Sequence, residues 1–252
     1  MSDRENYTLG YSPTAVDFVG RRTLESHGAF FIPHLRPGVS VLDCGCGPGS
    51  MTLGIAARIG AAHAVGVDMD ESQIATARAV AADRRVDNVR FETASVYALP
   101  FEDGAFDAIF SHALFEHLGE PLRAARECLR VLKPGGTIGV ATPDWGGFIV
   151  EPMSAELAAA ISAYETHLAR NGGNPRIGRK LASVLSDAGF VGARMQARYE
   201  NYDPLTIIGE VMACQADEAG MPRHAETFRR WQVQPMALFS QAWVSCVARR
   251  AG

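Results

Sequence analysis

Apolar and polar positions alternate in two different rhythms along this chain. Short runs rich in β-branched and aromatic residues, bounded by Gly, Asp or Pro, indicate strands. The first five such runs cover residues 39–43, 64–68, 89–93, 106–111 and 137–142. The stretches between them have the spacing of amphipathic helices, so strand and helix follow each other in series. This alternation predicts an α/β fold with a mostly parallel sheet, right-handed crossovers and helices on both faces.

The rhythm changes after Pro143, where helical segments predominate. Apolar residues recur at helical spacing from Leu157 to Leu168, and a second amphipathic helix ends before Gly189. A strand is predicted over 191–199, a further helical stretch over 204–235 and a last strand over 242–248. Residues 1–35 predict one or two helices ahead of the first strand.

Composition narrows the class of protein. At 252 residues and 47% hydrophobic, the chain is expected to form a single domain over residues 1–252. A net charge of −4 gives no general attraction to polyanions, so nucleic acid is a disfavoured partner. Five cysteines without a framework spacing favour a reducing compartment. No apolar run approaches the roughly 20 residues that span a bilayer, so we expect a cytoplasmic protein without stable membrane insertion, and a homodimer is left open.

A glycine-rich turn follows the first predicted strand. The sequence Asp43-Cys44-Gly45-Cys46-Gly47-Pro48-Gly49 leaves that strand, and a helix is predicted to start near Ser50 or Met51. Glycines let a ligand approach the backbone closely, and the free N–H groups of a helix start attract anionic groups. The turn differs from a dinucleotide fingerprint, since Ser50 replaces the third glycine, and it is no P-loop. An acidic residue beside free amides fits a ligand that carries both an ammonium group and a carboxylate.

The second predicted strand ends at Asp68. A carboxylate at that strand end of an open α/β sheet can hydrogen-bond a ribose diol. The alternative is that Asp68 caps the helix predicted to start near Glu71, a position for which Asp70 and Ser72 compete. Because the glycine turn and this carboxylate fall at matching strand ends, we interpret Asp68 as a ribose ligand.

Four sequence blocks together resemble a known family. They are Val41-Leu42-Asp43-Cys44-Gly45-Cys46-Gly47-Pro48-Gly49, Val65-Gly66-Val67-Asp68, Leu99-Pro100-Phe101-Glu102-Asp103-Gly104-Ala105-Phe106-Asp107 and Arg130-Val131-Leu132-Lys133-Pro134-Gly135-Gly136. In this order and spacing they resemble the class I S-adenosylmethionine (SAM)-dependent methyltransferases, in particular the branch of the ubiquinone and menaquinone C-methyltransferases. The resemblance implies a seven-stranded, mostly parallel Rossmann-like sheet with an antiparallel last strand and a small helical lid. We assign N-terminal helices to 1–37, the SAM-binding core to 38–145, and lid insertions to 146–176 and 204–236.

The resemblance also implies a set of cofactor contacts. Asp43 and the turn backbone would face the methionine end of SAM, Asp68 the ribose and Met69 the adenine. Relatives often carry Asp where this chain has Ser95, which can hydrogen-bond the adenine without a charge, and Val96 would use its backbone N–H. The complete set of candidate cofactor residues is Asp43, Gly45, Cys46, Gly47, Gly49, Asp68, Met69, Ser95, Val96 and His112.

Methyl transfer is an in-line displacement at a sulfonium carbon, so the protein supplies mainly alignment and a dry site. Where the acceptor must lose a proton, a positioned His, Glu or Tyr takes it. His112 is the first candidate because it lies beyond a strand end, where ligands gather. His117, next to Glu116 at a predicted helix start, and Tyr11 near the N-terminus are the others. Each has the alternative role of a packing residue.

The acceptor is less well defined than the donor. Trp145 and Phe148 either wall an acceptor pocket or pack under the lid, and the Met-rich stretch 204–236 allows the same two interpretations. The class of atom methylated, carbon, oxygen or nitrogen, stays open. Cys44 and Cys46 lack a second ligand pair, so no metal site is expected. We expect a small-molecule acceptor, and a hydrophobic one is left open.

Three other functions are the alternatives to methylation of a small molecule. A fold relative can bind SAM while catalysing a cyclisation or while only binding it. A nucleic-acid methyltransferase is disfavoured because the segment Ser111-His112-Ala113-Leu114 lacks the Asn/Asp-Pro-Pro-aromatic signature. An NAD-dependent oxidoreductase is disfavoured by Ser50 and by the Lys-Pro-Gly-Gly block.

Overall fold

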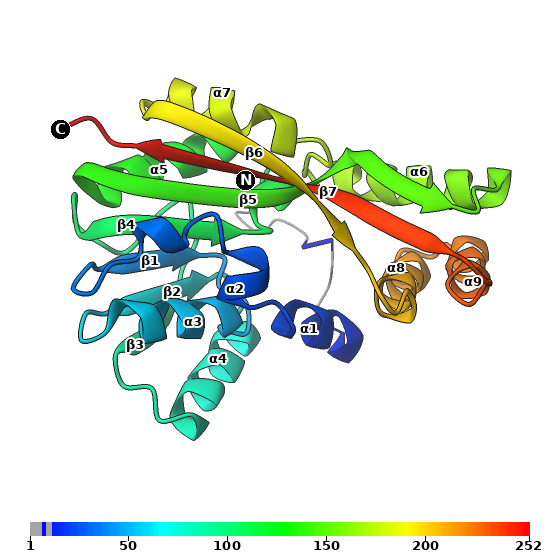
Figure 1. The fold of residues 1–252 in the computed structure, drawn as a ribbon, viewed down its shortest axis with the longest axis horizontal. Helices are drawn as coiled ribbons and strands as arrows, with labels where there is room; N and C mark the ends of the chain where they lie inside the picture. The colour runs from blue at the N-terminus through cyan, green and yellow to red at the C-terminus, as the bar shows by residue number, and fades with distance from the viewer. Residues whose placement is uncertain (1–6, 9–11) are drawn as a thin grey trace.

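A computed structural model describes residues 7–8 and 12–252 of the chain. Helices and strands alternate in the first half, and three long strands with the helices α6 to α9 make up most of the second (Figure 1). The elements are α1 (Pro13–Gly20), α2 (Leu24–His27), η1 (Ile32–His34), β1 (Val41–Cys44), α3 (Ser50–Ile59), β2 (Ala64–Asp68), α4 (Glu71–Asp83), β3 (Val89–Thr93), β4 (Phe106–His112), η2 (Phe115–His117), α5 (Pro121–Val131), β5 (Leu132–Glu151), α6 (Ala155–Arg170), η3 (Gly178–Lys180), α7 (Leu181–Ala188), β6 (Val191–Asn201), α8 (Thr206–Glu218), α9 (Pro222–Trp231) and β7 (Leu238–Arg249).

The strands form one seven-stranded sheet in the order β3-β2-β1-β4-β5-β7-β6. The first five strands are parallel, whereas β7 lies antiparallel between β5 and β6. The chain therefore moves outward from β1 to β3, returns to β4 on the other side of β1, and continues outward again. This confirms the predicted α/β fold with an antiparallel last strand, and it puts a topological switch point between β1 and β4.

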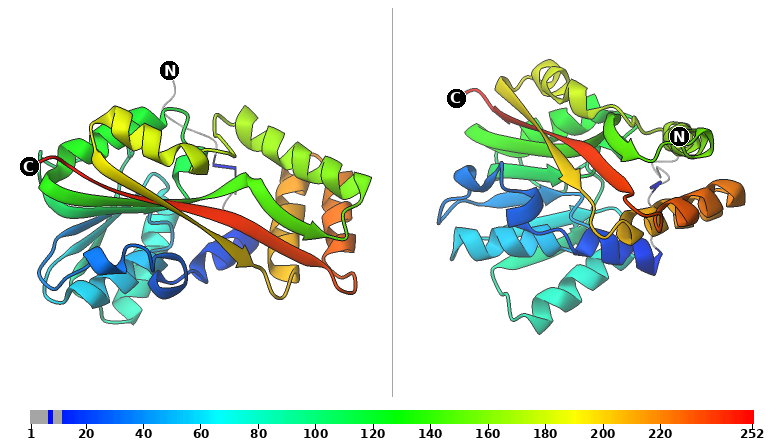
Figure 2. Two further views of the ribbon diagram at one scale, coloured as in Figure 1. Left: turned by 45° about the horizontal axis from the view of Figure 1, so that its top comes forward. Right: turned by 45° about the vertical axis from the view of Figure 1, so that its right-hand side comes forward.

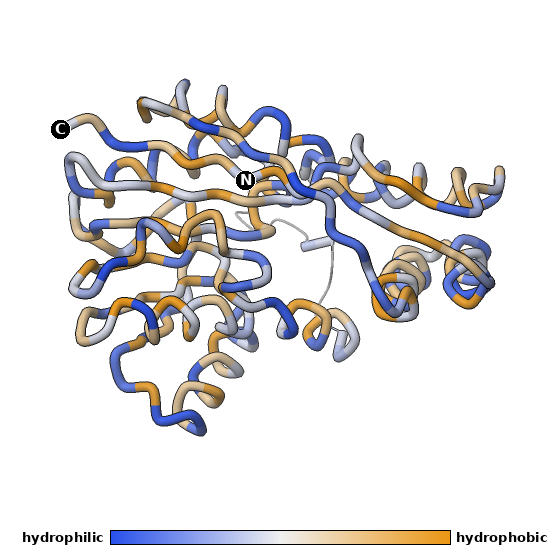
Figure 3. The backbone as a smooth tube through the Cα atoms, in the orientation of Figure 1, coloured by the Kyte–Doolittle hydropathy of each residue, from blue (hydrophilic) through white to orange (hydrophobic). Residues whose placement is uncertain are grey.

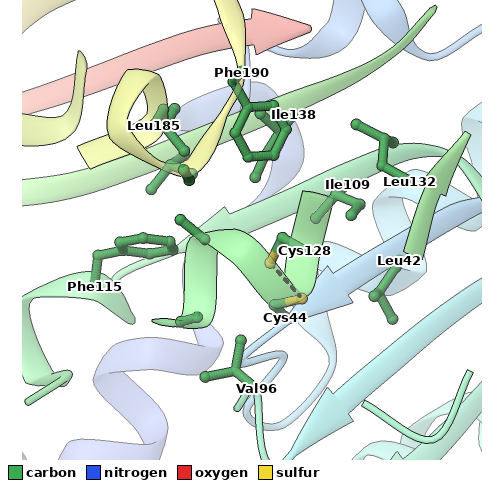
Figure 4. Close-up of a cluster of buried hydrophobic side chains, with 14 of the residues drawn as sticks. Leu42, Cys44, Val96, Ile109, Phe115, Cys128, Leu132, Ile138, Leu185 and Phe190 are labelled. Carbon is green, nitrogen blue, oxygen red and sulfur yellow. Dashed lines mark hydrogen bonds between the residues drawn. The ribbon is translucent and has the colours of Figure 1, made fainter. Parts of the chain in front are cut away.

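Helices cover both faces of the sheet (Figure 1). On one face α5 and α7 pack on the central strands through buried residues such as Cys128, Val131 and Leu185. Figure 4 shows part of this layer, where the sulfur atoms of Cys44 on β1 and Cys128 on α5 lie 4.0 Å apart. On the opposite face α2 and α3 bury their apolar residues against β1 and β4. Burial on both faces explains why the central strands are nearly uniform apolar runs.

The strands β5, β6 and β7 extend beyond the helical layers as a long twisted arm (Figure 2). The structure corrects the predicted strand over 137–142, because β5 has 20 residues and its outer part pairs with β7 from Phe148 to Glu151. Beside the arm, α6, α8 and α9 build a second apolar cluster around Phe228 and Phe239. These helices lie within the ranges predicted for a lid. Many hydrophilic residues of β6 lie at the open sheet edge (Figure 3).

Local signals placed most of the other element ends correctly. The helix after the glycine turn starts at Ser50, and Asp70 caps the helix that starts at Glu71. Glu116 and His117, by contrast, are not at a helix start. They lie in the short 3₁₀ turn η2, and α5 begins only at Pro121. Proline favours the first turn of an α-helix, and Pro121 accordingly stands at the first position of α5. Within the described residues, no helix is both long and apolar enough to traverse a bilayer.

Replacing Gly49 by alanine is expected to destabilise the fold. Gly49 adopts φ +84°, and a Cβ there would lie 2.8 Å from Cζ of Phe91 and 2.9 Å from Cβ of Ala77. Gly38 is a matched control, because it adopts φ +90° but has no neighbour within 4 Å of a Cβ. We expect losses of about 1 kcal/mol for Gly38→Ala and about 2 kcal/mol for Gly49→Ala in urea unfolding. Equal losses would mean that the Phe91 contact has no energetic effect.

Candidate active site

A deep cleft opens at the carboxyl ends of β1, β2 and β4, beside the switch point of the sheet. We call it the main cleft. It is lined by the glycine turn, the end of β2, the segment after β3 and the segment after β4, and α1 closes one side. Its residues include Asp43, Gly45, Cys46, Gly47, Asp68, Met69, Ser95, Val96, His112 and His117. All predicted cofactor residues except Gly49 therefore line one cavity.

The glycine turn is held against the end of β2 by backbone hydrogen bonds. The N–H groups of Gly45 and Cys46 both donate to the carbonyl oxygen of Val67. Gly47 faces open space, since a Cβ there would have no neighbour closer than 3.8 Å. Gly49 lies behind the turn and packs against Phe91. The turn thus presents backbone to the cleft at Gly47 and uses Gly49 for close packing.

Asp43 is a buried carboxyl group at the base of this turn. Only 2% of the residue is exposed, and one carboxylate oxygen accepts a hydrogen bond of 2.6 Å from the Thr52 hydroxyl. Burial raises its pKa to about 7, and the nearby Asp68 carboxylate adds to the effect. Among the described residues no cation is paired with Asp43. A cationic ligand would stabilise its charged form, so the site fits the ammonium group of SAM.

Binding of a cation at Asp43 should depend on pH in a defined direction. Below about pH 7 the free protein holds Asp43 protonated, and a bound ammonium group requires it ionised. The SAM amino group, with an ordinary pKa of about 8, stays charged in this range. Affinity for S-adenosylhomocysteine (SAH) should therefore fall as pH drops below 7, by up to about tenfold per unit. Calorimetric titrations with SAH from pH 5 to 7 test this. The Asp43→Asn variant should bind SAH weakly, with an affinity that does not change over this pH range. If SAH affinity in this variant depended on pH as in the wild type, the assignment of Asp43 would be contradicted.

Asp68 connects the end of β2 with the glycine turn. Its two carboxylate oxygens accept hydrogen bonds of 3.0 Å from the N–H groups of Gly47 and Asp70. Burial raises the pKa of Asp68 despite these hydrogen bonds. The helix-capping alternative is ruled out, because Asp70 accepts the hydrogen bonds from the N–H groups of Ser72 and Gln73 at the start of α4. Asp68 is thus free of a capping role and borders the cleft.

Met69, Ser95 and Val96 form the side of the cleft away from the glycine turn. Met69 is 41% exposed, an unusual state for a large apolar side chain that lines a cavity. The Ser95 hydroxyl accepts a long hydrogen bond of 3.3 Å from the N–H of Tyr97. Val96 is buried against the core. These positions provide an apolar surface with one hydroxyl, which fits a purine ring.

A second cavity, which we call the aromatic chamber, adjoins the main cleft. The two share Tyr7, Arg22, Ala113 and His117 as lining residues. Beyond these, the chamber is walled mostly by aromatic and aliphatic side chains, namely Phe18, Trp145, Tyr164, Leu168, Tyr202, Ile208, Val211, Met212 and Trp243. Trp145 thus both lines the chamber and packs in the second cluster, whereas Phe148 only packs against that cluster. Ala113, at the junction, adopts φ +56°.

His117 and Glu116 lie buried where cleft and chamber meet. Burial lowers the pKa of His117 to about 3 and raises the pKa of Glu116 to about 7. The Glu116 carboxyl accepts a short hydrogen bond from the Thr142 hydroxyl, and His117 Nε2 lies 3.7 Å from Oε1 of Glu116. Among the described residues, Nδ1 of His117 has no hydrogen-bond partner. A neutral imidazole therefore presents an unused nitrogen at the junction.

His112 borders the main cleft but not the chamber. Its ring stacks on Trp243 with centroids 4.7 Å apart and an interplanar angle of 11°. Burial and the charge of Arg22 hold the pKa of His112 well below the ordinary value, and within the described part of the chain its Nε2 has no hydrogen-bond partner. The third predicted catalytic residue, Tyr11, lies outside the described residues. Tyr7, four positions earlier in the chain, packs edge-on against His117 with ring centroids 4.6 Å apart.

Sequence reasoning missed the chamber residues that come from distant parts of the chain. Arg22 follows α1, Tyr202 follows β6, and Gln241 and Trp243 belong to β7. None of them belongs to a local motif. The sequence does show aromatic and polar residues in the predicted N-terminal helices and in the last strand. Their presence did not indicate which of them face the cleft.

The architecture and the main cleft together define a methyltransferase. Residues 41–136 match a protein family described as a methyltransferase domain. The chain is 32% identical over 206 residues to a nocamycin O-methyltransferase from Saccharothrix syringae, covering 73% of this chain and 69% of that protein. The chain belongs to the class I SAM-dependent methyltransferases, as the sequence blocks predicted.

Two further similarities frame the question of activity. An uncharacterized 37.1 kDa protein in a transposon of Streptomyces fradiae is 31% identical over 218 residues, which cover 84% of this chain. The chain spans only 59% of the length of that relative. Among solved structures, the [4+2]-cyclase SpnF superposes with a TM-score of 0.59 at 25% identity, covering 98% of this chain and 85% of that one.

Proposed function

We propose that this protein transfers the methyl group of SAM to a small-molecule acceptor held in the aromatic chamber. The supporting observation is that the main cleft, which carries the family's SAM-binding turn, adjoins the largely apolar aromatic chamber and shares Tyr7, Arg22, Ala113 and His117 with it. When bound, SAM supplies an electrophilic methyl group on a sulfonium. An apolar chamber beside it excludes water and aligns the acceptor, the two contributions that methyl transfer requires.

Each side of the site has its own residues in this proposal. Asp43 binds the amino group of the donor, the backbone at Gly47 accommodates its methionine part, and Asp68 holds the ribose hydroxyls. Met69, Ser95 and Val96 border the adenine. At the junction, His117 contacts the acceptor through Nδ1. His112, which lines the main cleft, supports this region by stacking on Trp243.

The proposal is tested in two stages. Calorimetry with SAH on protein stripped of co-purified nucleosides should show saturable binding. Methyl transfer is then measured as SAH release during incubation with SAM and a panel of phenols, enols, carboxylates and amines. Methylated product that appears with equimolar SAH supports the assignment. Absence of SAH binding would remove it altogether.

A SAM-binding enzyme that catalyses cyclisation is the second candidate, and the likeness to SpnF favours keeping it. It differs from the first in one measurable respect, because SAM is not consumed. Tight SAH binding combined with no SAH release for any acceptor of the panel would favour this candidate. Product that retains the mass of its precursor would then identify the reaction.

A further inference from the structure

Gln241 is a buried amide in the wall of the aromatic chamber. It lies on β7, it lines the chamber and not the main cleft, and only 2% of the residue is exposed. Among the residues that the structure describes, its Nε2 has no hydrogen-bond partner. Leaving a buried amide N–H without a partner is costly. A molecule in the chamber that accepts a hydrogen bond from Nε2 removes this cost.

Two neighbouring side chains fix the orientation of this amide. The Trp243 indole N–H, which can only donate, donates to the Tyr202 hydroxyl at 3.4 Å. That hydroxyl in turn donates its proton to Oε1 of Gln241 at 3.3 Å. Burial raises the pKa of Tyr202 to about 12, so the hydroxyl keeps this proton. The oxygen end of the Gln241 amide is therefore engaged, and the nitrogen end is left as a donor for a ligand.

Little charge lies on the chamber walls beyond the junction with the main cleft. Among the described residues, those that line the chamber but not the main cleft include no Lys, Arg, His or Asp and a single Glu. This residue, Glu116, accepts a hydrogen bond from the Thr142 hydroxyl, and burial raises its pKa to about 7. Arg22, by contrast, is shared with the main cleft. An anionic group among the walls beyond the junction would be buried without an opposite charge, which is unfavourable.

We infer that the acceptor carries an uncharged carbonyl oxygen, which accepts a hydrogen bond from Nε2 of Gln241 inside the aromatic chamber. This inference rests on the proposed function and names the class of its acceptor. A carbonyl oxygen matches the site because it accepts hydrogen bonds and has no proton of its own. The aromatic and aliphatic walls bind the apolar remainder of the molecule by burial.

The place of Gln241 also sets the direction in which the acceptor lies. Gln241 borders only the chamber, whereas His117 and Ala113 lie at its junction with the main cleft. An acceptor held by its carbonyl at Gln241 therefore directs another atom toward the junction, where the methyl group of the donor is proposed to be. That second atom is the one methylated. Gln241 thus selects and orients the acceptor without exchanging a proton with it.

The test compares ligands that differ by one oxygen. Acetophenone with ethylbenzene, and 1-indanone with indane, are pairs of similar shape in which C=O replaces CH₂. Each ligand is titrated into the SAH-loaded and the cofactor-free protein at pH 7.5. The ratio of ketone affinity to hydrocarbon affinity should be about tenfold higher in the wild type than in Gln241→Leu, which removes the donor. Comparing ratios cancels the difference in hydration between ketone and hydrocarbon.

Two further variants and a charged ligand make the comparison specific. Gln241→Met keeps the length of the side chain without its N–H, so it should lower the ratio as Gln241→Leu does. Gln196→Leu is the matched control, because Gln196 is exposed on the neighbouring strand β6 and does not line the chamber. It should leave the ratio within about twofold of that in the wild type. Benzoate, which carries a charge on the same ring, should bind more weakly than acetophenone.

The outcomes separate the possible errors. SAH affinity within about threefold of wild type shows that the Gln241 variants are folded, since Gln241 does not border the main cleft. An equal ratio in the wild type and in both Gln241 variants would mean that Nε2 meets only water, and it would overturn the inference. Tighter binding of benzoate than of acetophenone would overturn it too, as would no binding of either ketone. Failure of the wild type to bind SAH, with a ketone preference that depends on Gln241, would refute the proposed function and leave the carbonyl site standing.

Discussion

Replacing Asp68 by alanine should weaken SAH binding by about 100-fold. The variant loses the carboxylate proposed to accept hydrogen bonds from the ribose hydroxyls, and each such charged hydrogen bond contributes about 1.5 to 3 kcal/mol. It also releases the N–H of Gly47, which Asp68 holds at 3.0 Å in the free protein. Both changes should weaken SAH binding more than they lower the stability of the fold. Calorimetric titration with SAH at pH 8 measures the change.

Asp70→Ala is the matched control for this experiment. Asp70 lies two residues further along the chain and caps α4 without lining the cleft. Its removal should cost about 1 kcal/mol of stability, visible in urea unfolding, while SAH affinity stays within about twofold. Asp68→Ala should show the opposite combination. Wild-type SAH affinity in Asp68→Ala would exclude Asp68 from the site and, with it, the proposed orientation of the ribose.

The elements that could be predicted from the sequence are those determined by short stretches of the chain. The strands β1, β2 and β4 are short, mostly apolar runs between turn residues and are almost completely buried, so the pattern in the chain matches the layer in space. The long outer part of β5 was not predictable in this way. Gly146 and Gly147 interrupt its pattern, and the register with β7 shifts between Asp144 and Phe148. Pairing with a strand almost 100 residues away compensates for these interruptions, which no local window can reveal.

The same distinction applies to the site. Asp43 and Asp68 could be singled out because the roles proposed for them depend on a strand end and an adjacent turn, both visible within a few residues of sequence. Arg22 and Gln241 both line the aromatic chamber, although they are 219 positions apart in the numbering. The chamber proposed to hold the acceptor is thus assembled from non-local contacts, whereas the turn proposed to hold the donor is encoded locally. For this reason the sequence indicated a methyl donor more clearly than an acceptor.

Two tryptophans of the second apolar cluster can test whether the acceptor binds in the aromatic chamber. Trp145 is 5% exposed and packs on Tyr164 and Phe239, with ring centroids 4.5 and 6.3 Å away. Trp231 is 3% exposed and meets the same Phe239 edge-on at 6.0 Å. Replacing either by alanine should lower the free energy of unfolding by about 3 to 5 kcal/mol. Urea unfolding of the two variants should therefore give similar losses.

Only one of these changes should alter catalysis selectively. Trp145 lines the chamber and Trp231 does not, so Trp145→Ala should raise the acceptor KM about tenfold or more, since a buried aromatic contact of this size contributes at least 1.4 kcal/mol. Trp231→Ala should keep the acceptor KM within about twofold at a temperature where both variants are folded. SAH affinity should be unchanged in both, because neither residue borders the main cleft. If the acceptor KM rises equally in both variants, the effect comes from loosening of the whole arm, and the chamber is not the place where the acceptor binds.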